Sequence, residues 1–204
     1  MTTSRSRAPR ADARRNYERL MAAADDSFAA EGVGASLEKI AKAAGVAIGT
    51  LYSHFPTRDD LLAHLIADRI NQLTERGRKL LDAQDPAAAL FEGLHAFGAD
   101  AAAYQGLPDS VIRTLHDQQS ALFTPCESMR QTCGALLKRA QAARQVRTDT
   151  TPAEVLAMTA AIAGAARAGG HDTGHFLAVL TSGLRQTRQP SRSKPSGIRK
   201  ASKT

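Results

Sequence analysis

The sequence predicts an all-α protein, and three observations carry this prediction. Alanine is very frequent, and it is the residue that favours helix most strongly. Runs of Val, Ile and Thr, which are typical of strands, are nearly absent. Apolar residues recur along most of the chain at the three- and four-residue spacing of an amphipathic helix. The 204 residues are enough for one mid-sized core, or for a small module fused to a larger one.

The formal net charge of +7 is unevenly distributed along the chain. Residues 1–15 hold five arginines and one aspartate, and residues 185–204 hold seven basic residues and no acidic one. The body between these ends is therefore net acidic. The basic ends have two interpretations that the sequence leaves open: solvated, disordered ends, or segments that contact nucleic acid.

Several classes of protein are disfavoured. Two cysteines are too few for a disulfide framework and fit a reducing cytoplasmic setting, so we expect a cytoplasmic protein. No apolar signal segment is present in residues 1–19, and no run of about 18 apolar residues predicts a membrane span. Because the chain has no nucleophile elbow, P-loop or dinucleotide fingerprint, we expect neither an enzyme nor a bound cofactor.

Capping residues, glycines and prolines divide the chain into predicted helices. The first four are expected over about 10–31, 37–44, 48–55 and 57–81, separated by Gly32, Gly45 and Pro56. Asp85-Pro86 starts a helix that reaches about residue 104, and residues 106–108 start another. A long segment covers about 115–143, with a break near Pro125. Thr151-Pro-Ala-Glu combines a capping box with proline at the first helical position, and the last two helices cover about 152–169 and 173–186.

Residues 36–58 have the pattern of a helix-turn-helix. Ile40, Ala41 and Val46 supply an apolar corner, and Gly45 supplies the tight turn. The second helix begins near Ala47 with small residues that allow close approach to a DNA backbone. Hydroxyl and imidazole groups follow, which suit phosphates and base edges in the major groove.

Two strings within this segment resemble one family. Ile-Ala-Lys-Ala-Ala-Gly-Val and Gly-Thr-Leu-Tyr-Ser-His-Phe-Pro-Thr-Arg-Asp-Asp-Leu-Leu are similar to the DNA-binding domain of the tetracycline-repressor-like (TetR) family of bacterial regulators. The resemblance covers about residues 10–68. It implies an all-helical homodimer whose three-helix N-terminal domain binds a palindromic operator in double-stranded DNA. It also implies a larger C-terminal domain that binds a small effector and dimerises.

The resemblance implies a set of DNA-contacting residues: Ser36, Leu37, Ala47, Ile48, Gly49, Thr50, Tyr52, Ser53, His54 and Arg58. Leu51 and Phe55 are structural in the family and are expected to be buried. The chain departs from the family pattern at Ala47, where Ser is common, and at Leu37 and Arg58, where Thr and Lys are frequent. Ile48 offers an apolar contact for a thymine methyl group.

The expected organisation is a basic arm over 1–9, a DNA-binding domain over 10–56, a ligand-binding and dimerisation domain over 57–188, and a basic tail over 189–204. Homodimerisation is expected through the last two helices, which would form a four-helix bundle with their twofold mates. Side chains small or apolar enough to pack there are Leu156, Thr159, Ala160, Ala163, Gly164, Phe176, Val179, Leu180 and Gly183.

The effector is not identified by sequence, and the candidate ligand contacts are His95, His116 and Cys126. On one helix Cys126 and Cys133 would lie about 10 Å apart, too far for a disulfide. Core packing, pocket lining and thiol sensing all remain open for these cysteines. His171 and His175 have a metal-binding spacing, but two ligands are too few, so no metal site is expected.

The function expected first is an effector-responsive homodimeric regulator, usually a repressor, whose ligand changes the spacing of the two recognition helices. An alternative is an architectural DNA binder of low sequence specificity that uses the basic ends. An enzyme is the third possibility, without a site to support it.

Overall fold

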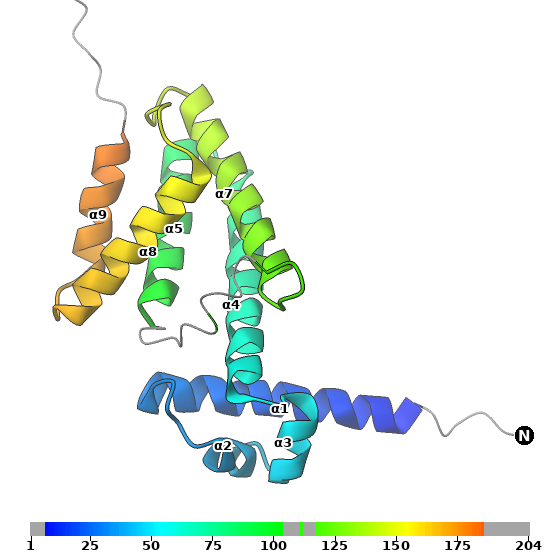
Figure 1. The fold of residues 1–204 in the computed structure, drawn as a ribbon. Coiled ribbons are helices and arrows are strands. Elements are labelled where there is room, and N and C mark those ends of the chain that lie inside the picture. Colours follow the sequence, from blue (N-terminus) through cyan, green and yellow to red (C-terminus); the bar gives the residue numbers. More distant parts are fainter. Residues whose placement is uncertain (1–6, 104–110, 112–116, 186–204) are drawn as a thin grey trace, which may run out of the picture.

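The computed structural model describes residues 7–103, 111 and 117–185, and these form eight helices joined by short turns and loops (Figure 1). The helices are α1 (Arg7–Glu31), α2 (Leu37–Ala43), α3 (Ile48–His54), α4 (Arg58–Leu80), α5 (Pro86–Ala103), α7 (Phe123–Ala142), α8 (Pro152–Ala168) and α9 (Thr173–Leu184). Within these residues the only strand-like pairing is an isolated bridge between Val146 and Arg185. The all-α prediction is confirmed.

The observed helix ends lie within a few residues of most of the predicted ones. The largest difference is at α7, which was expected to begin near residue 115 and begins at Phe123. Pro125 lies in its first turn and is buried there. A proline is tolerated at this place because the first backbone N–H groups of a helix have no intrahelical acceptor. The helix predicted to start at residues 106–108 lies outside the described residues.

The first three helices and the first half of α4 enclose the N-terminal core. Leu20 on α1, Ile40 on α2 and Leu51 on α3 have no exposed surface. Leu61 and Leu62 on α4 are equally buried and belong to the same cluster. Figure 1 shows α1 lying across the lower end of α4, with α2 and α3 beneath it.

Helix α4 continues upward into a second layer of helices, where it packs against α7 and α5. Gly77 on α4 makes this close packing possible, because a Cβ atom at this position would lie 3.0 Å from Cγ2 of Thr132 on α7. The second core gathers side chains of α5, α7 and α8, among them the buried Leu90, Leu137 and Val155. The expected domain boundary at residues 56–57 falls before α4, whereas the apolar contacts of α4 fall in both cores.

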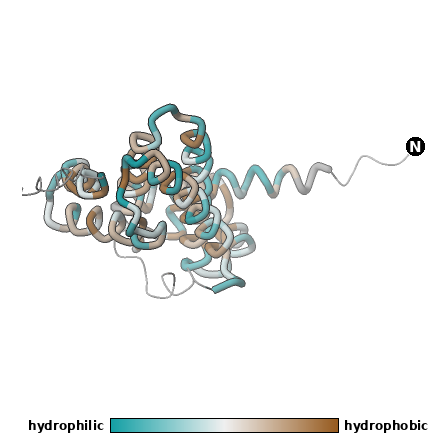
Figure 2. Tube along the Cα trace, turned by 90° about the horizontal axis from the view of Figure 1, so that it is seen from above, coloured by the Kyte–Doolittle hydropathy of each residue, from teal (hydrophilic) through white to brown (hydrophobic). Residues whose placement is uncertain are grey.

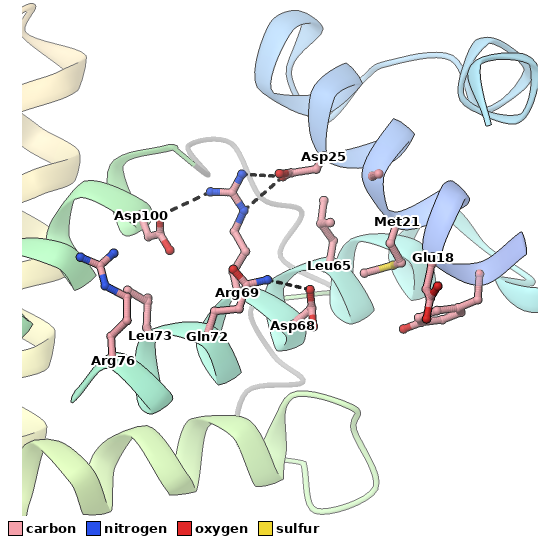
Figure 3. A pocket seen from close by; sticks show the side chains of 12 residues that line it. Glu18, Met21, Asp25, Leu65, Asp68, Arg69, Gln72, Leu73, Arg76 and Asp100 are labelled. Carbon is pink, nitrogen blue, oxygen red and sulfur yellow. Dashed lines mark hydrogen bonds and ion pairs between the residues drawn. The ribbon is translucent and has the colours of Figure 1, made fainter. Parts of the chain in front are cut away.

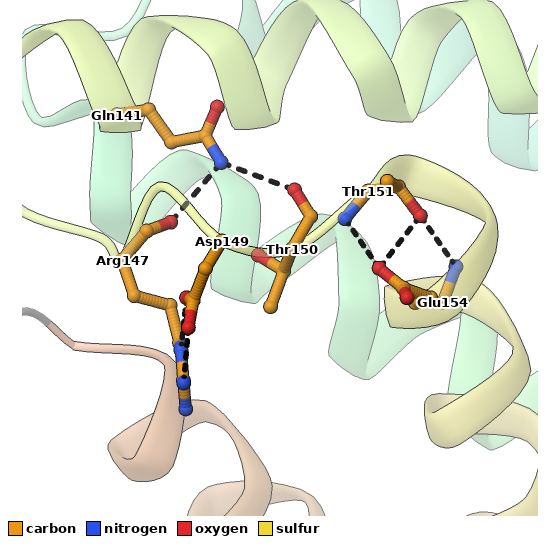
Figure 4. A network of polar contacts seen from close by, with 6 residues as sticks. All are labelled: Gln141, Arg147, Asp149, Thr150, Thr151 and Glu154. Atoms are coloured by element: carbon orange, nitrogen blue, oxygen red, sulfur yellow. Dashed lines mark hydrogen bonds and ion pairs between the residues drawn. The ribbon is translucent and has the colours of Figure 1, made fainter.

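The turn between α7 and α8 is held by a polar network (Figure 4). The side-chain amide of Gln141 donates to the carbonyls of Arg147 and Thr150, at 3.0 and 3.3 Å. Thr151 then caps α8, because its hydroxyl accepts from the backbone N–H of Glu154 while Oε2 of Glu154 accepts from the backbone N–H of Thr151 at 2.8 Å. The hydrogen bonds from Thr151 lower the pKa of the Glu154 carboxyl.

Helices α8 and α9 pack on α5 and on each other, and their outer surface shows which predicted dimer residues are available. Thr159 and Ala163 are fully buried within the chain, so they are not available for a partner. The exposed face of α8 carries alanines instead: Ala153, Ala157, Ala161 and Ala165. On α9 Val179 is 61% exposed and Phe176 is 37% exposed. Phe176 also stacks on His171, with 5.3 Å between ring centroids.

The N-terminal part of α1 projects from the body of the molecule and is mainly hydrophilic (Figure 2). Its exposed side chains include Arg14 and Arg15, which pair within the helix with Glu18 and Asp12. Over the described ranges, no helix is both long and apolar enough to cross a membrane. The same ranges contain no group of three or more His, Cys, Asp or Glu residues arranged to hold a metal ion.

The capping box at Thr151 generates a stability prediction. Replacing Thr151 by Ala removes the side-chain acceptor for the N–H of Glu154, and this change is expected to lower the free energy of unfolding by about 1 kcal/mol. Urea denaturation followed by circular dichroism measures the loss. Thr148→Ala, at an exposed threonine three residues earlier, is the matched control. Equal stability of the two variants would show that the cap contributes nothing.

Candidate functional site

The turn between α2 and α3 has the geometry of a Schellman motif. Gly45 has a φ of +66°, in the left-handed region that favours glycine. Its N–H donates to the carbonyl of Lys42, and the N–H of Val46 donates to the carbonyl of Ala41, both at 3.0 Å. Half-buried Val46 packs on the N-terminal core. The predicted tight turn at Gly45 is therefore present, and it fixes the angle between α2 and α3.

Helix α3 has one buried face and one exposed face. Leu51 and the adjoining Phe55 are fully buried, as expected. Tyr52 is 49% exposed and Ile48 is 38% exposed, although both are large side chains. A Cβ atom on Gly49 would meet nothing within 4 Å. The exposed side of α3 is therefore an open surface that another molecule can approach closely.

Four other residues predicted for this surface are half-buried or make a structural contact. Ser36 caps α2, because its hydroxyl accepts from the N–H of Lys39 at 3.4 Å. Leu37 packs partly against the N-terminal core. The hydroxyl of exposed Ser53 donates to the carbonyl of half-buried Thr50 at 2.7 Å. Ala47 is exposed and precedes the first residue of α3.

His54 lies at the edge of the exposed face and packs against aromatic neighbours. Its ring is 6.2 Å from that of Tyr17 on α1, in an edge-to-face arrangement. Tyr17 in turn lies 5.5 Å from Phe55. Burial and the nearby Asp68 carboxylate raise the pKa of the Tyr17 hydroxyl. His54 therefore ties α3 to α1 as well as bordering the open surface.

Arg58, predicted to contact a phosphate group, is half-buried at the start of α4 and holds a loop. Its Nη1 donates to the carbonyls of Val33 and Ala35 at 3.0 and 2.5 Å. These bonds join α4 to the segment between α1 and α2. The sequence did not predict this role because the two acceptors are backbone carbonyls, which every residue has, so no residue type indicates them.

A second feature is an apolar cavity of about 360 Å³ between α4, α5, α7 and α8. Its apolar lining is Ile66, Ile70, Leu73, Phe97, Ala101, Met129, Leu156 and Ala160. Leu156 and Ala160, predicted for the dimer interface, thus face this cavity. The absence of Trp agrees with a lining in which Phe97 is the only aromatic side chain among the described residues.

The candidate ligand contacts fall in different places. Cys126 lines the apolar cavity, whereas His95 is half-buried on α5 and does not border it. His116 lies outside the described residues. Burial raises the pKa of the Cys126 thiol, partly opposed by the charge of Arg130, and burial raises the pKa of Cys133 to about 11. Both thiols are therefore protonated at neutral pH, which opposes a role in thiol sensing.

Two charged groups also border the apolar cavity, and sequence reasoning missed both. Arg69 on α4 donates to Oδ1 of Asp25 on α1, at 3.1 Å from Nε and 2.5 Å from Nη2 (Figure 3). Its Nη1 lies 3.4 Å from Oδ1 of Asp100 on α5. The available signal was the position of Arg69 in the apolar stripe of α4, four residues from both Leu65 and Leu73.

The two faces of α3 generate a prediction about folding. Leu51→Ala leaves a cavity in the core and is expected to lower the free energy of unfolding by about 2 to 5 kcal/mol. Tyr52→Ala, at the adjoining exposed position, is expected to change it by no more than about 0.5 kcal/mol. Chemical denaturation of both variants measures the difference. A large loss for Tyr52→Ala would mean that its ring supports the core.

Comparisons with known proteins agree with this architecture. Residues 20–65 match a family model described as bacterial regulatory proteins of the tetR family. Residues 85–186 match one described as the C-terminal domain of SbtR-like transcriptional regulators. A comparison with curated proteins gives no match.

Solved structures with this fold include other regulators. A TetR transcription regulatory protein from Mycobacterium vanbaalenii is 35% identical, with a TM-score of 0.62 over 86% of this chain and 98% of that one. A TetR transcriptional regulator from Streptomyces coelicolor is 29% identical, with a TM-score of 0.63 over 83% and 98%. The fold alone is shared with FadR from Bacillus subtilis, solved in complex with stearoyl-CoA, which is 18% identical with a TM-score of 0.58 over 82% and 99%.

The helix-turn-helix and the helical C-terminal region are each matched by a TetR family model, and a TetR regulator matched over most of both chains is 35% identical. The chain therefore belongs to the TetR family of bacterial transcriptional regulators, which are DNA-binding proteins and not enzymes.

Proposed function

We propose that this regulator is a ligand-released repressor that acts as a homodimer on a palindromic operator. The observation that carries the proposal is that α3 has one buried face and one exposed face. Leu51 and the adjoining Phe55 are buried, whereas Ile48 and Tyr52 lie on an open surface. Ile48 and Tyr52 are four residues apart and therefore neighbours on the helix surface, and adjoining exposed apolar side chains are typical of an interaction site. The major groove of DNA has the width to accept such a helix.

On this proposal the direct contacts come from the exposed residues of α3 and its start. They are Ala47, Ile48, Gly49, Tyr52 and Ser53. Ile48 is suited to a thymine methyl group and Tyr52 to a phosphate or a base edge. The half-buried residues Ser36, Leu37, Thr50, His54 and Arg58 border or support this surface, and Arg58 does so by holding the loop before α2.

Most of the positive charge for phosphate contacts must come from outside the helix-turn-helix. Residues 36–58 contain Lys39, Lys42 and Arg58 as their only Lys or Arg residues. Lys39 pairs with Glu31 at 3.3 Å, and Arg58 is bonded to two backbone carbonyls. We therefore infer that the arginine-rich start of the chain, which leads into projecting α1, supplies phosphate contacts.

The outer face of α8 and α9 supports dimerisation. The exposed alanines of α8 allow a second helix to approach closely, and exposed Val179 and Phe176 on α9 offer apolar surface. A twofold pairing of this face gives the dimer two copies of α3, one for each half of a palindromic operator. Recognition helices in such dimers bind half-sites about 34–36 Å apart.

The apolar cavity supports release by a ligand. It borders α4, and the first half of α4 belongs to the core that holds the recognition helix. A ligand that binds one tilt of α4 better than another shifts the population toward that tilt. In the related fold of FadR the ligand is stearoyl-CoA, and an apolar lining here suits an apolar portion of a ligand.

Selection of bound duplexes from a random DNA pool tests the proposal. The expected product is an inverted repeat whose half-site centres lie one helical turn apart. At about 0.15 M salt the selected duplex should bind at least about 10³-fold tighter than a scrambled duplex. A ratio below about ten, with a steep salt dependence, would instead support an architectural binder of low specificity.

The selected duplex also tests the role of Tyr52. Removal of its ring and hydroxyl in Tyr52→Ala is expected to weaken binding by about 1 to 3 kcal/mol at unchanged thermal stability. Tyr52→Phe removes only the hydroxyl, so it distinguishes the contribution of the hydroxyl to DNA affinity from that of the ring. Unchanged affinity of Tyr52→Ala would remove this residue from the interface.

A further inference from the structure

The apolar cavity has a polar end formed by Arg69 and Asp100, and these are its only charged lining residues in the described chain. The same two residues also line a neighbouring cleft of about 550 Å³ between α1 and α4 (Figure 3). Their side chains therefore stand between an apolar space and a polar one. A molecule in the apolar cavity that carries a polar group meets this pair first.

Among the described residues that line the cleft beside Arg69, carboxylates outnumber guanidinium groups. Its guanidinium is shared between the carboxylates of Asp25 and Asp100. The cleft adds Glu18, Asp68 and Arg76. Glu18 is already paired with Arg14 at 2.8 Å, so among the described lining residues of the cleft there remain the carboxylates of Asp25, Asp68 and Asp100 and the guanidinium groups of Arg69 and Arg76. An added cation neutralises the excess, whereas an added anion increases the repulsion.

The carboxylate of Asp100 can accept further hydrogen bonds. Arg69 makes its short bonds to Asp25, at 2.5 and 3.1 Å, and reaches Asp100 only at 3.4 Å. An ionised carboxylate has about four acceptor positions. The side chain of Asp100 is 32% exposed, so burial in the chain does not close these positions. A donor that arrives through the apolar cavity can therefore bond to Asp100 without breaking the Arg69–Asp25 pair.

The walls of the cavity favour a cation with an apolar body. Aliphatic side chains from α4, α7 and α8 form most of the lining, and Phe97 on α5 lies one turn before Asp100. An aromatic face near a carboxylate attracts an ammonium group through its ring electrons. Cys126, the remaining polar lining residue, is held protonated and adds no charge.

We propose that the cavity between α4, α5, α7 and α8 binds an amphiphilic amine, with its ammonium group on Asp100 and its apolar body against Phe97, Met129 and Leu156. An anion with the same apolar body would have to displace a carboxylate from Arg69 in a surrounding that is already acidic. This cavity is the effector site of the proposed function. Binding of the amine does not depend on that function, but the regulatory consequence of binding rests on it.

The regulatory consequence follows from the position of Arg69. An ammonium group on Asp100 competes with the long contact from Arg69 and leaves the Arg69–Asp25 pair in place. The link between α4 and α5 is thereby weakened, while the link between α4 and α1 is kept. The remaining contacts of α4 with α7 and α5 then set how far α4 tilts together with the N-terminal core.

Binding of octylammonium, octanoate and octanol to the DNA-free protein by calorimetry tests the ligand class. These probes share one chain and differ in the charge of the head group. Octylammonium is expected to bind at least about tenfold tighter than either other probe. Asp100→Asn should remove this preference, and Asp100→Glu should restore most of it. Asp82→Asn, which removes an exposed acid after α4, is the matched control and should keep the preference.

Two results would overturn the proposal: octanoate or octanol binding as tightly as octylammonium, or a preference that survives in Asp100→Asn. Thermal melting of each variant shows that the comparison is made on folded protein. Affinity for the selected duplex is measured separately. Specific DNA binding without a preference for the amine rejects the ligand class and leaves the repressor proposal standing. A preference for the amine without specific DNA binding supports the ligand class and rejects the repressor proposal.

Discussion

The structure depends on one helix, α4, whose apolar side chains are buried in two cores. Its first half contributes Leu61, Leu62 and Leu65 to the core around α3, and its second half packs against α7 and α5. Full burial of a Leu or Ile side chain stabilises the fold by about 1.5–3 kcal/mol. Several such side chains at one end contribute as much as the whole net stability of a typical domain, about 5–15 kcal/mol. Helix α4 is therefore held firmly in the N-terminal core, and since its other half packs against α7 and α5, a signal between the two cores can pass as a movement of the intact helix.

The recognition surface is built by burial more than by its exposed groups. Leu51 and Phe55 orient α3, the Schellman turn at Gly45 fixes its angle to α2, and Arg58 holds the loop before α2 through two carbonyls. These contacts are made before any other molecule binds. The exposed residues of α3 can therefore differ between proteins of this fold while the frame that carries them stays the same.

The sequence predicted most of the fold because its helices are bounded by strong local signals. Thr57, Thr151 and Gly45 each act through a few neighbouring residues, so their effects can be read from spacing alone. The face of α8 could not be read in this way. Alanine lies on its buried and exposed sides alike, so there is no apolar contrast to show that Ala163 points inward and Ala161 outward.

The parts of the candidate sites that depend on distant segments were also missed. The Asp25–Arg69–Asp100 cluster joins three helices, and no local pattern links Arg69 to acids 44 and 31 residues away. The role of Arg58 was hidden for the same reason, since its partners are backbone atoms about 25 residues earlier. Cys126 borders the apolar cavity, and pocket lining was one of the three alternatives that the sequence left open for it. Helical spacing alone could not separate a pocket wall from a packed core.

The length of α4 determines how far one of its ends moves when the helix rotates about the other end. Its 23 residues extend over about 34 Å. A rotation of about 5° around one end moves the other end by about 3 Å, close to the rise of a single base pair in DNA. Because α4 is one continuous helix, a displacement of its middle, beside the cavity, that is smaller than the diameter of a water molecule moves its N-terminal end, beside α3, by about the distance between two base pairs.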